Sequence, residues 1–279
     1  MSGTLPLTER RAAFRKLHES GCFVMPNPWD PGSARYLRHL GFPALATTSG
    51  GFAFSRGLPD TDWAVPLDSA LAHIADIAAA VDLPVNADFE SGYAHEPEGV
   101  AENVRQCIET GVAGLSIEDA TGDRERPLYE LTLAIARIQA ARAAVDKSGA
   151  DVLLTARAEC YLVGHPDPFA ESVRRLQAYA EAGADVLYAP GPQRPEEIGE
   201  LVSALHPKPV NVIVSRNIGL TVADLAELGV RRISVGSALA RAAWSGFLHA
   251  AKAIAHDGSF SGLEGAAPFA ELNAFFRGE

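Results

Sequence analysis

Two short segments of the sequence place carboxylates where a buried strand is expected to end. The first is VNADFESG, residues 85–92, and the second is GLSIEDATGD, residues 114–123. Side chains alternate along a strand, so residues two apart share one face. Asp88 and Glu90 are therefore expected to point the same way from the end of the first strand.

Glu118 and Asp119 close the second strand beside that pair. Carboxylates at neighbouring strand ends repel one another, which is costly unless a cation or a proton lies among them. Oxygen ligands of this kind suit a hard divalent metal, with Mg²⁺ as the first choice and Mn²⁺ as an alternative. We therefore predict a metal site at Asp88, Glu90 and Glu118. The competing interpretation is that these acids are helix caps or surface charges.

An arginine ends another apolar run, LLTAR, at Arg157. A guanidinium group binds a carboxylate through two parallel N–H donors, so Arg157 is expected to hold the carboxylate of a small substrate. A metal bridging the acids and that substrate would satisfy both halves of the site. The alternative is that Arg157 only neutralises Glu159 or the acid cluster.

Three further strand ends carry polar residues. Ser49, Gly50 and Gly51 follow one strand, and their backbone N–H groups suit a carboxylate or an oxyanion. They could also form nothing more than a tight turn. Asn211 lies along a later strand and Ser237 ends the last one, so both are candidates for substrate binding.

The elements that must position these residues alternate along the whole chain. Eight apolar runs are expected to be strands, namely residues 22–27, 44–49, 83–89, 113–119, 151–159, 185–191, 209–215 and 231–237. Between them lie stretches with apolar spacing near 3.6, which predict helices. Continuous apolar strands with helical crossovers indicate a parallel sheet covered on both faces. Eight such units predict a (β/α)₈ TIM-type barrel, whose active site lies at the carboxyl ends of the strands. A doubly wound open sheet fits less well, since no GxGxxG follows the first strand.

Composition and charge narrow the class further. The chain has 279 residues, 47% of them hydrophobic and 21% charged, which is typical of a large folded core. A formal net charge of −11 argues against nucleic acid or an anionic membrane surface as partner. Three cysteines make no disulfide framework, and no signal peptide or spanning segment is evident. We therefore expect a cytoplasmic enzyme acting on a small carboxylate.

The last part of the chain, residues 238–279, is expected to add helices to a single barrel domain of residues 1–279. It contains Phe260, Phe269 and the pair Phe275–Phe276 in little space. Such apolar content needs a surface to cover, either this barrel or a neighbouring subunit. A homo-oligomer is therefore expected.

The order of the motifs resembles the isocitrate lyase/phosphoenolpyruvate mutase superfamily. The motifs are SGG…GLPD, DxE-x-G-Y, IED, TAR and an asparagine on the seventh strand, and the resemblance covers residues 20–245. It implies a modified (β/α)₈ barrel that binds Mg²⁺ and a 2-keto or 2-hydroxy carboxylate. It also implies breakage of a C–C or P–C bond through an enolate-like intermediate, and a dimer or tetramer that exchanges its eighth helix.

The resemblance also implies roles for the acidic residues. Asp88 matches the principal metal ligand, and Glu90 stands where members usually have a second aspartate. Glu118 would hold a metal-bound water, and Asp60, in GLPD, would belong to the acidic network around the metal. Among these, Asp60 and Glu118 are expected to take part in catalysis together with Arg157.

For the substrate, the resemblance implies that Ser49, Gly50 and Gly51 bind one carboxylate. Arg157 would hold the carboxylate and the oxyanion. Asn211 and Ser237 would line the distal part of the pocket.

The sequence departs from the superfamily in one loop that matters for chemistry. Isocitrate and methylisocitrate lyases carry a Lys-Arg-Cys-Gly-His motif whose cysteine is the acid, whereas residues 120–130 read ATGDRERPLYE. We therefore expect a decarboxylase or lyase for an oxaloacetate-like acid, with His95, Cys160 or His165 as open candidates for the proton donor. Phosphoenolpyruvate mutase or phosphonopyruvate hydrolase chemistry, and a non-catalytic keto-acid-binding protein, stay as alternatives. The arginines of RERP, residues 124–127, are candidates for a substrate-covering loop.

Overall fold

The structure is a computed structural model that describes residues 5–278, and its centre is one sheet of eight parallel strands. The strands are β1 Phe23–Met25, β2 Leu45–Ala46, β3 Val85–Asp88, β4 Gly114–Glu118, β5 Leu153–Arg157, β6 Val186–Tyr188, β7 Val210–Ile213 and β8 Arg232–Ser234. Each lies inside a predicted apolar run but is shorter than it.

The strands form a nearly closed ring. Their order is β1-β8-β7-β6-β5-β4-β3-β2, and all neighbouring pairs are parallel. Between β1 and β2 the Ala46 N–H donates to the Pro26 carbonyl at 3.0 Å, which bridges the remaining edge. Eight parallel strands alternating with helices make a (β/α)₈ TIM-type barrel, so the predicted fold is confirmed.

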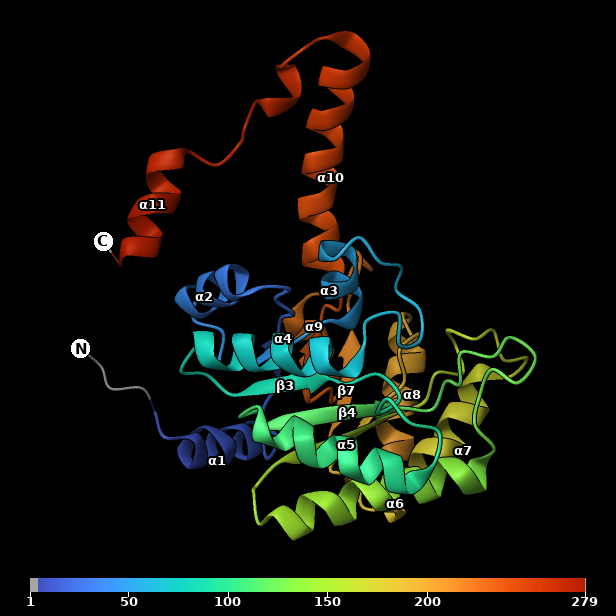
Figure 1. Cartoon of the computed structure of the whole chain (residues 1–279). Coiled ribbons are helices and arrows are strands. Elements are labelled where there is room, and N and C mark those ends of the chain that lie inside the picture. Colours follow the sequence, from blue (N-terminus) through green and yellow to red (C-terminus); the bar gives the residue numbers. More distant parts are fainter. Residues whose placement is uncertain (1–4, 279) are drawn as a thin grey trace. The chain divides into compact units, whose positions relative to one another are not determined.

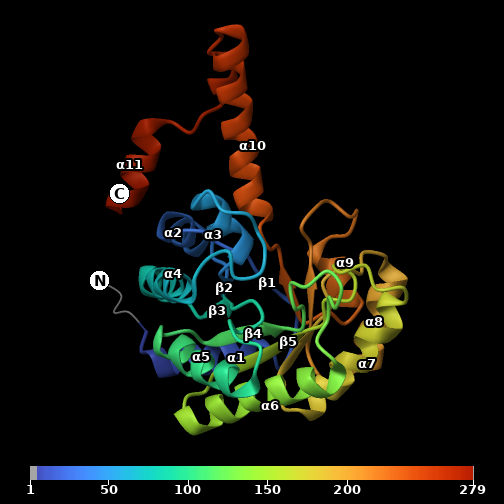
Figure 2. The same cartoon turned by 45° about the vertical axis from the view of Figure 1, so that its right-hand side comes forward.

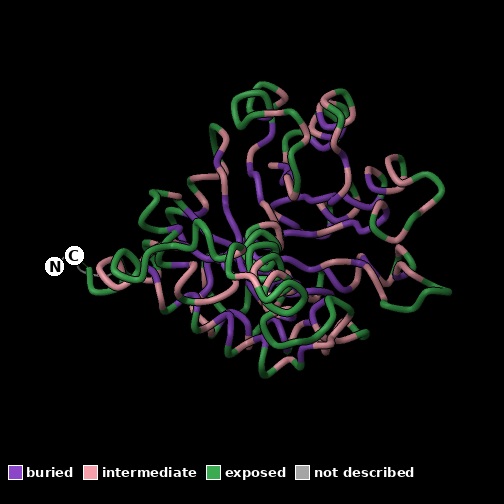
Figure 3. The backbone as a smooth tube through the Cα atoms, turned by 90° about the horizontal axis from the view of Figure 1, so that it is seen from above, coloured by how far each residue is buried: buried purple, intermediate pink, exposed green. Residues whose placement is uncertain are grey.

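Helices surround the strands in Figures 1 and 2. They are α2 Pro31–His39, α3 Ser49–Ser55, α4 Leu67–Ala80, α5 Pro97–Glu109, α6 Leu131–Ser148, α7 Pro168–Glu181, α8 Pro195–Leu205 and α9 Val222–Glu227. Local chemistry sets several of their ends. For example, α2 begins with Pro31 at its first position and with a reciprocal capping box between Asp30 and Ser33. Buried stretches of backbone run through the interior, and exposed stretches form the outer loops (Figure 3).

Helix α1, Leu7–Leu17, was not predicted from the sequence and covers the amino-terminal ends of the strands. Phe14 is fully buried in a cluster with residues at the beginnings of four strands. Arg11 donates through Nε to the Val112 carbonyl at 2.9 Å, just before β4. The barrel is thus sealed at the end opposite to the predicted active site.

The C-terminal segment, Leu239–Glu279, is a compact unit separate from the barrel, Met1–Ala238. It contains most of α10 Ala238–Lys252, a π-helical turn Ala253–Asp257, a short 3₁₀ helix Ser261–Leu263 and α11 Phe269–Arg277. Its large apolar side chains are exposed, among them Phe247, Phe260 and Phe269. Packing of this segment on the barrel or on a neighbouring subunit stays a prediction. None of the helices in residues 5–278 has the length and apolar content needed to cross a bilayer.

Candidate active site

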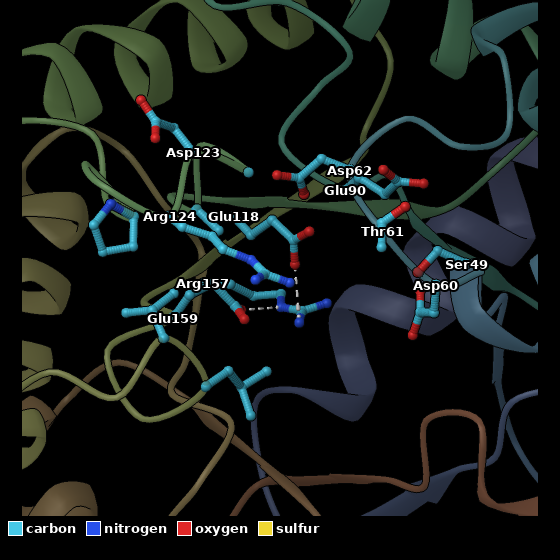
Figure 4. A pocket seen from close by; sticks show the side chains of 15 residues that line it. Ser49, Asp60, Thr61, Asp62, Glu90, Glu118, Asp123, Arg124, Arg157 and Glu159 are labelled. Carbon is cyan, nitrogen blue, oxygen red and sulfur yellow. Dashed lines mark hydrogen bonds and ion pairs between the residues drawn. The ribbon is translucent and has the colours of Figure 1, made fainter.

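A cavity of about 620 Å³ opens at the carboxyl ends of β2 to β5, as expected for this fold. Its charged lining consists of Asp60, Asp62, Glu90, Glu118, Asp123, Arg124, Arg157 and Glu159 (Figure 4). The structure therefore brings together five of the residues singled out in the sequence: Ser49, Asp60, Glu90, Glu118 and Arg157. Six carboxylates face only two guanidinium groups, so the cavity is strongly anionic.

Arg157 is the centre of the acid cluster. Its Nε donates to Glu159 at 2.8 Å, and its two terminal nitrogens reach Asp88 and Glu118 at 2.9 Å each. The guanidinium plane also lies over the Tyr188 ring, 5.0 Å from its centroid. Figure 4 shows the contacts to Glu118 and Glu159 as dashed lines. The sequence left substrate binding and neutralisation of the acids open for Arg157, and in this structure Arg157 neutralises them.

Asp88 joins β3 to the loop after β2. Its Oδ2 accepts hydrogen bonds from the Ser49 backbone N–H at 2.9 Å and from the Ser49 hydroxyl at 3.0 Å. Ser49 opens α3, and the preceding Thr48 caps that helix by accepting from the Gly51 N–H at 3.1 Å. The predicted glycine-rich turn is thus the first turn of a helix, and two of its N–H groups are engaged by the protein itself.

Gly50 is needed for a close approach of Asp60 to the backbone, a role that the sequence did not reveal. A Cβ atom at this position would lie 2.4 Å from Oδ2 of Asp60, which is far inside any normal contact. Asp60 therefore packs directly against the backbone of α3 at the wall of the cavity. Partial desolvation and the nearby Asp88 carboxylate raise the pKa of Asp60.

The prediction that Asp88 and Glu90 share a strand face was wrong. Strand β3 ends at Asp88, and Glu90 has a left-handed backbone with φ of 46° in the following turn. The chain reverses there because the Gly92 N–H donates to the Phe89 carbonyl at 2.9 Å. The turn, and not strand alternation, brings the Glu90 side chain to the cavity.

Two residues that the sequence did not single out hold the Glu90 carboxylate. Oε2 accepts from the Trp63 backbone N–H at 2.9 Å, and Oε1 accepts from the Tyr93 hydroxyl at 2.8 Å. Within residues 5–278, Trp63, Glu90 and Tyr93 are the non-glycine residues with positive φ. Such strain is typical of functional sites. Burial raises the pKa of Glu90 to about 7, although both hydrogen bonds favour the ionised form.

Glu118 and Asp119 have different surroundings despite being adjacent. Glu118 lines the cavity, and burial together with the Glu159 and Asp88 carboxylates raises its pKa, against the effect of Arg157. Asp119 lies in the barrel wall. It accepts from the Glu159 N–H at 2.8 Å, the Tyr179 hydroxyl at 2.5 Å and Arg175 at 3.2 Å.

The two distal residues named in the sequence lie elsewhere. Asn211 is buried inside the barrel, where its amide donates to Ser234 at 3.0 Å and accepts from Arg232 at 2.8 Å. Ser237 is half-buried in the turn between β8 and α10. Neither is among the residues that line the cavity of Figure 4. Their assignment to substrate binding stays a prediction.

The three candidate proton donors also lie outside this lining. His95 bonds the Tyr129 hydroxyl through Nδ1 at 2.7 Å, and His165 lies beside the Asp167 backbone. Cys160 is fully buried, and burial raises the pKa of its thiol to about 11. None of these contacts directs the residue into the cavity.

The cavity offers carboxylate oxygens, which are suitable ligands for a magnesium ion. Within residues 5–278, no three acidic, histidine or cysteine side chains converge closely enough to hold an ion by themselves. Mg²⁺, however, usually keeps several waters and takes only one or two carboxylates from the protein. Burial is the main cause of the raised pKa values of Asp60, Glu90 and Glu118, and neighbouring carboxylates add to it. A divalent cation would relieve that repulsion. The residues therefore fit a partly hydrated magnesium ion.

Comparison with known families gives a direct result. Residues 14–255 match the family described as Phosphoenolpyruvate phosphomutase. The chain belongs to this family, within the isocitrate lyase/phosphoenolpyruvate mutase superfamily. The resemblance inferred from the motifs is therefore confirmed.

Similar sequences have several activities. An uncharacterized protein of Mycobacterium tuberculosis is 37% identical over 94% of this chain and 95% of its own length. An oxaloacetate decarboxylase of Paraburkholderia xenovorans is 28% identical over 84% of this chain and 77% of its length. A 2-methylisocitrate lyase of Escherichia coli is 35% identical, but over 60% of this chain and 55% of its length.

Solved structures agree on the fold. A protein from Burkholderia cenocepacia J2315 superposes with a TM-score of 0.93 at 46% identity, over 97% of each chain. Oxaloacetate acetylhydrolase with bound oxalate gives 0.84 at 27% identity, over 97% of this chain and 94% of its own. Phosphonopyruvate hydrolase with oxalate and Mg²⁺ gives 0.84 at 26%, over 96% and 95%.

Proposed function

We propose that the chain is a Mg²⁺-dependent lyase or decarboxylase that cleaves a C–C bond of a small 2-keto or 2-hydroxy carboxylate, such as an oxaloacetate-like acid, through an enolate. The acid cluster around Arg157 supports this best, because three carboxylates, those of Asp88, Glu118 and Glu159, share one guanidinium group and offer oxygen ligands to a cation. Asp88, Glu90 and Glu118 would hold the metal, partly through water. When bound, Mg²⁺ supplies Lewis acidity that stabilises negative charge on the substrate oxygens.

The chain's own residues have separate tasks in this proposal. Ser49 fixes the Asp88 carboxylate through two hydrogen bonds, so that its other oxygen is oriented toward the cluster. Once a cation neutralises the charge of the acids, Arg157 would donate two of its N–H groups to the substrate carboxylate in place of one acid. Trp63 and Tyr93 hold Glu90 in place, and Asp60 closes the wall against Gly50.

The test is turnover of oxaloacetate, its methylated homologues, isocitrate and methylisocitrate with and without Mg²⁺. We expect Asp88→Asn to lower kcat/KM by about 100-fold or more, since transition-state charge loses its stabilisation. Glu109→Gln is the matched control, because this acid is exposed on α5 and, among residues 5–278, pairs only with Arg105. Free Mg²⁺ decarboxylates oxaloacetate slowly, so its rate is subtracted. Equal turnover in Asp88→Asn and the wild type would refute the proposal.

P–C bond chemistry is the second candidate, and the family match over residues 14–255 supports it. A phosphonopyruvate assay separates the two. Release of phosphate or formation of phosphoenolpyruvate, with no C–C cleavage in the panel, would favour this candidate. Binding of keto acids with no turnover at all would favour a non-catalytic carboxylate-binding protein.

A further inference from the structure

We propose that Arg124 is the specificity-determining residue that binds a second, distal carboxylate of the substrate, so that the site selects dicarboxylates over monocarboxylates. This inference rests on the proposed function of the same cavity. Arg124 belongs to the loop whose sequence differs from the lyase motif. The inference follows from the distribution of charged side chains in the cavity.

The first observation concerns the other arginine of the site. All three edges of the Arg157 guanidinium group are occupied, by Asp88, Glu118 and Glu159. With a cation held by the acids, one of these edges would be free for the substrate's first carboxylate. Arg157 has no further capacity for a second anion.

The second observation is that Arg124 lines the same cavity without a partner. Figure 4 shows its side chain extending from the loop into the cavity. Across the part of the chain that the structure describes, residues 5–278, no ion pair or hydrogen bond engages its side chain. An unpaired guanidinium group among six carboxylates is a ready site for a planar anion, because its fork matches a carboxylate.

The third observation distinguishes Arg124 from Arg126, two residues further along the loop. Arg126 pairs with Asp123 at 3.4 Å and lines a different cavity of about 540 Å³, together with His95 and Tyr129. The irregular backbone of the loop thus sends the two arginines into different cavities, although residues two apart would share a face in a regular strand. Arg126 is therefore a matched control of equal charge.

The loop itself holds Arg124 in position. The Thr121 N–H donates to the Pro127 carbonyl at 3.0 Å, and the Tyr129 N–H donates to the Asp119 carbonyl at 3.0 Å. Ala120 and Leu128 form an antiparallel bridge between these bonds. A tethered hairpin limits the conformational entropy that the arginine loses when an anion binds.

The chemistry of the lining explains why the second group should be a carboxylate. An anion entering this cavity meets the repulsion of six carboxylates. A metal held by Asp88 and Glu118 would compensate the charge at the head of the substrate. A negative charge at the tail needs its own cation, and Arg124 is the unpaired cation that lines the cavity.

The experiment compares acids that differ only by the distal carboxylate. Malate and lactate are titrated calorimetrically, with Mg²⁺ present, into the full-length wild type and into Arg124→Ala, Arg124→Lys and Arg126→Ala. We expect Arg124→Ala to weaken malate binding about 10- to 100-fold, the range for charge-assisted hydrogen bonds, and to change lactate binding less than twofold. Arg124→Lys should recover part of the malate affinity, and Arg126→Ala should match the wild type.

Three outcomes would overturn the inference. They are equal losses for malate and lactate in Arg124→Ala, equal losses for malate in Arg124→Ala and Arg126→Ala, and a wild type that does not prefer malate over lactate. Turnover is recorded separately. If the wild type shows the Arg124-dependent preference but no turnover of any acid, the lyase proposal fails and the specificity role of Arg124 stands.

Discussion

Two adjacent acids at the end of β4 lie in different surroundings: one faces the cavity, and the other is buried in the barrel wall. Glu118 faces the cavity and contacts Arg157 at 2.9 Å. Asp119 is only 4% exposed and accepts three hydrogen bonds, one from the Glu159 N–H just after β5 and two from side chains of α7. A strand end points successive side chains to opposite faces, so the two acids have different tasks.

Asp119→Asn should therefore affect stability more than chemistry. The substitution removes the charge that Arg175 and the Tyr179 hydroxyl face in a buried environment. We expect the free energy of unfolding to fall by about 2–4 kcal/mol, the range for breaking a buried charged pair. Chemical denaturation measures this directly.

Glu118→Gln is the paired control at the next position. It should lower turnover and leave the free energy of unfolding within about 1 kcal/mol, because Glu118 already has surplus negative neighbours. The reverse pattern, with Glu118→Gln unstable and Asp119→Asn stable but inactive, would contradict this division.

At the scale of elements, periodicity predicted the eight strands and the helices between them, because apolar spacing decides which face is buried. It missed α3, since Ser49, Gly50 and Gly51 have low helix propensity. The Thr48 cap and the close packing of Gly50 on Asp60 override that propensity. Such tertiary contacts cannot be read from local spacing.

The site shows the same limit. Ser49, Glu118 and Arg157 could be predicted from the sequence, because barrel strands direct the residues at their carboxyl ends to one face. Glu90 was found for the wrong reason, since a left-handed turn places it. Trp63 and Tyr93, which hold it, carried no signal, because their role depends on two loops meeting in space.

The hairpin of residues 121–127 offers a test at this scale. Gly122 has φ of 76°, and a Cβ there would lie 2.0 Å from Oδ2 of Asp62. Gly122→Ala should therefore unseat the loop and lower kcat/KM by about 10-fold, at a local strain of about 1–2 kcal/mol. The loop is exposed, so the melting temperature should change little.

Gly149→Ala separates the collision from backbone strain. Gly149 ends α6 with φ of 66°, and nothing lies within 4 Å of its would-be Cβ. It therefore shares the conformational cost and lacks the clash. Equal kinetics in the two variants would show that the Asp62 contact does not position the loop.

The stability of the whole molecule is expected to depend on pH through a histidine at the end of the barrel that α1 covers. Near α1, His18 Nδ1 donates to the Phe14 carbonyl at 2.8 Å, and the Arg232 guanidinium approaches Nε2 at 3.4 Å. Burial, followed by Arg232, lowers the pKa of His18 to about 3. Protonation would place two cations together where Arg232 is only 2% exposed.

The sign follows from linkage. The unfolded chain binds a proton at His18 near pH 6.5 and the folded chain does not, so stability is complete above that pH and falls as the pH decreases toward 3. Between pH 6.5 and 5 the loss should be about 2 kcal/mol from this group. Urea unfolding of the wild type and His18→Gln at pH 7 and pH 5 measures it. Identical pH dependence in both proteins would exclude His18 as the cause.

The ladder lengths around the barrel differ from one side to the other. β4 and β5 pair over five residues, whereas β2 pairs over two, and the Ala46 N–H to Pro26 contact bridges the edge between β1 and β2. Transient opening of a ring of strands begins where the fewest backbone hydrogen bonds must break, so the edge between β1 and β2 is the weakest. The carboxylates at the ends of β3 to β5 lie on the side of the barrel where the strands pair over more residues. We therefore expect an opening of the ring at the edge between β1 and β2 to leave the spacing of the charged groups unchanged.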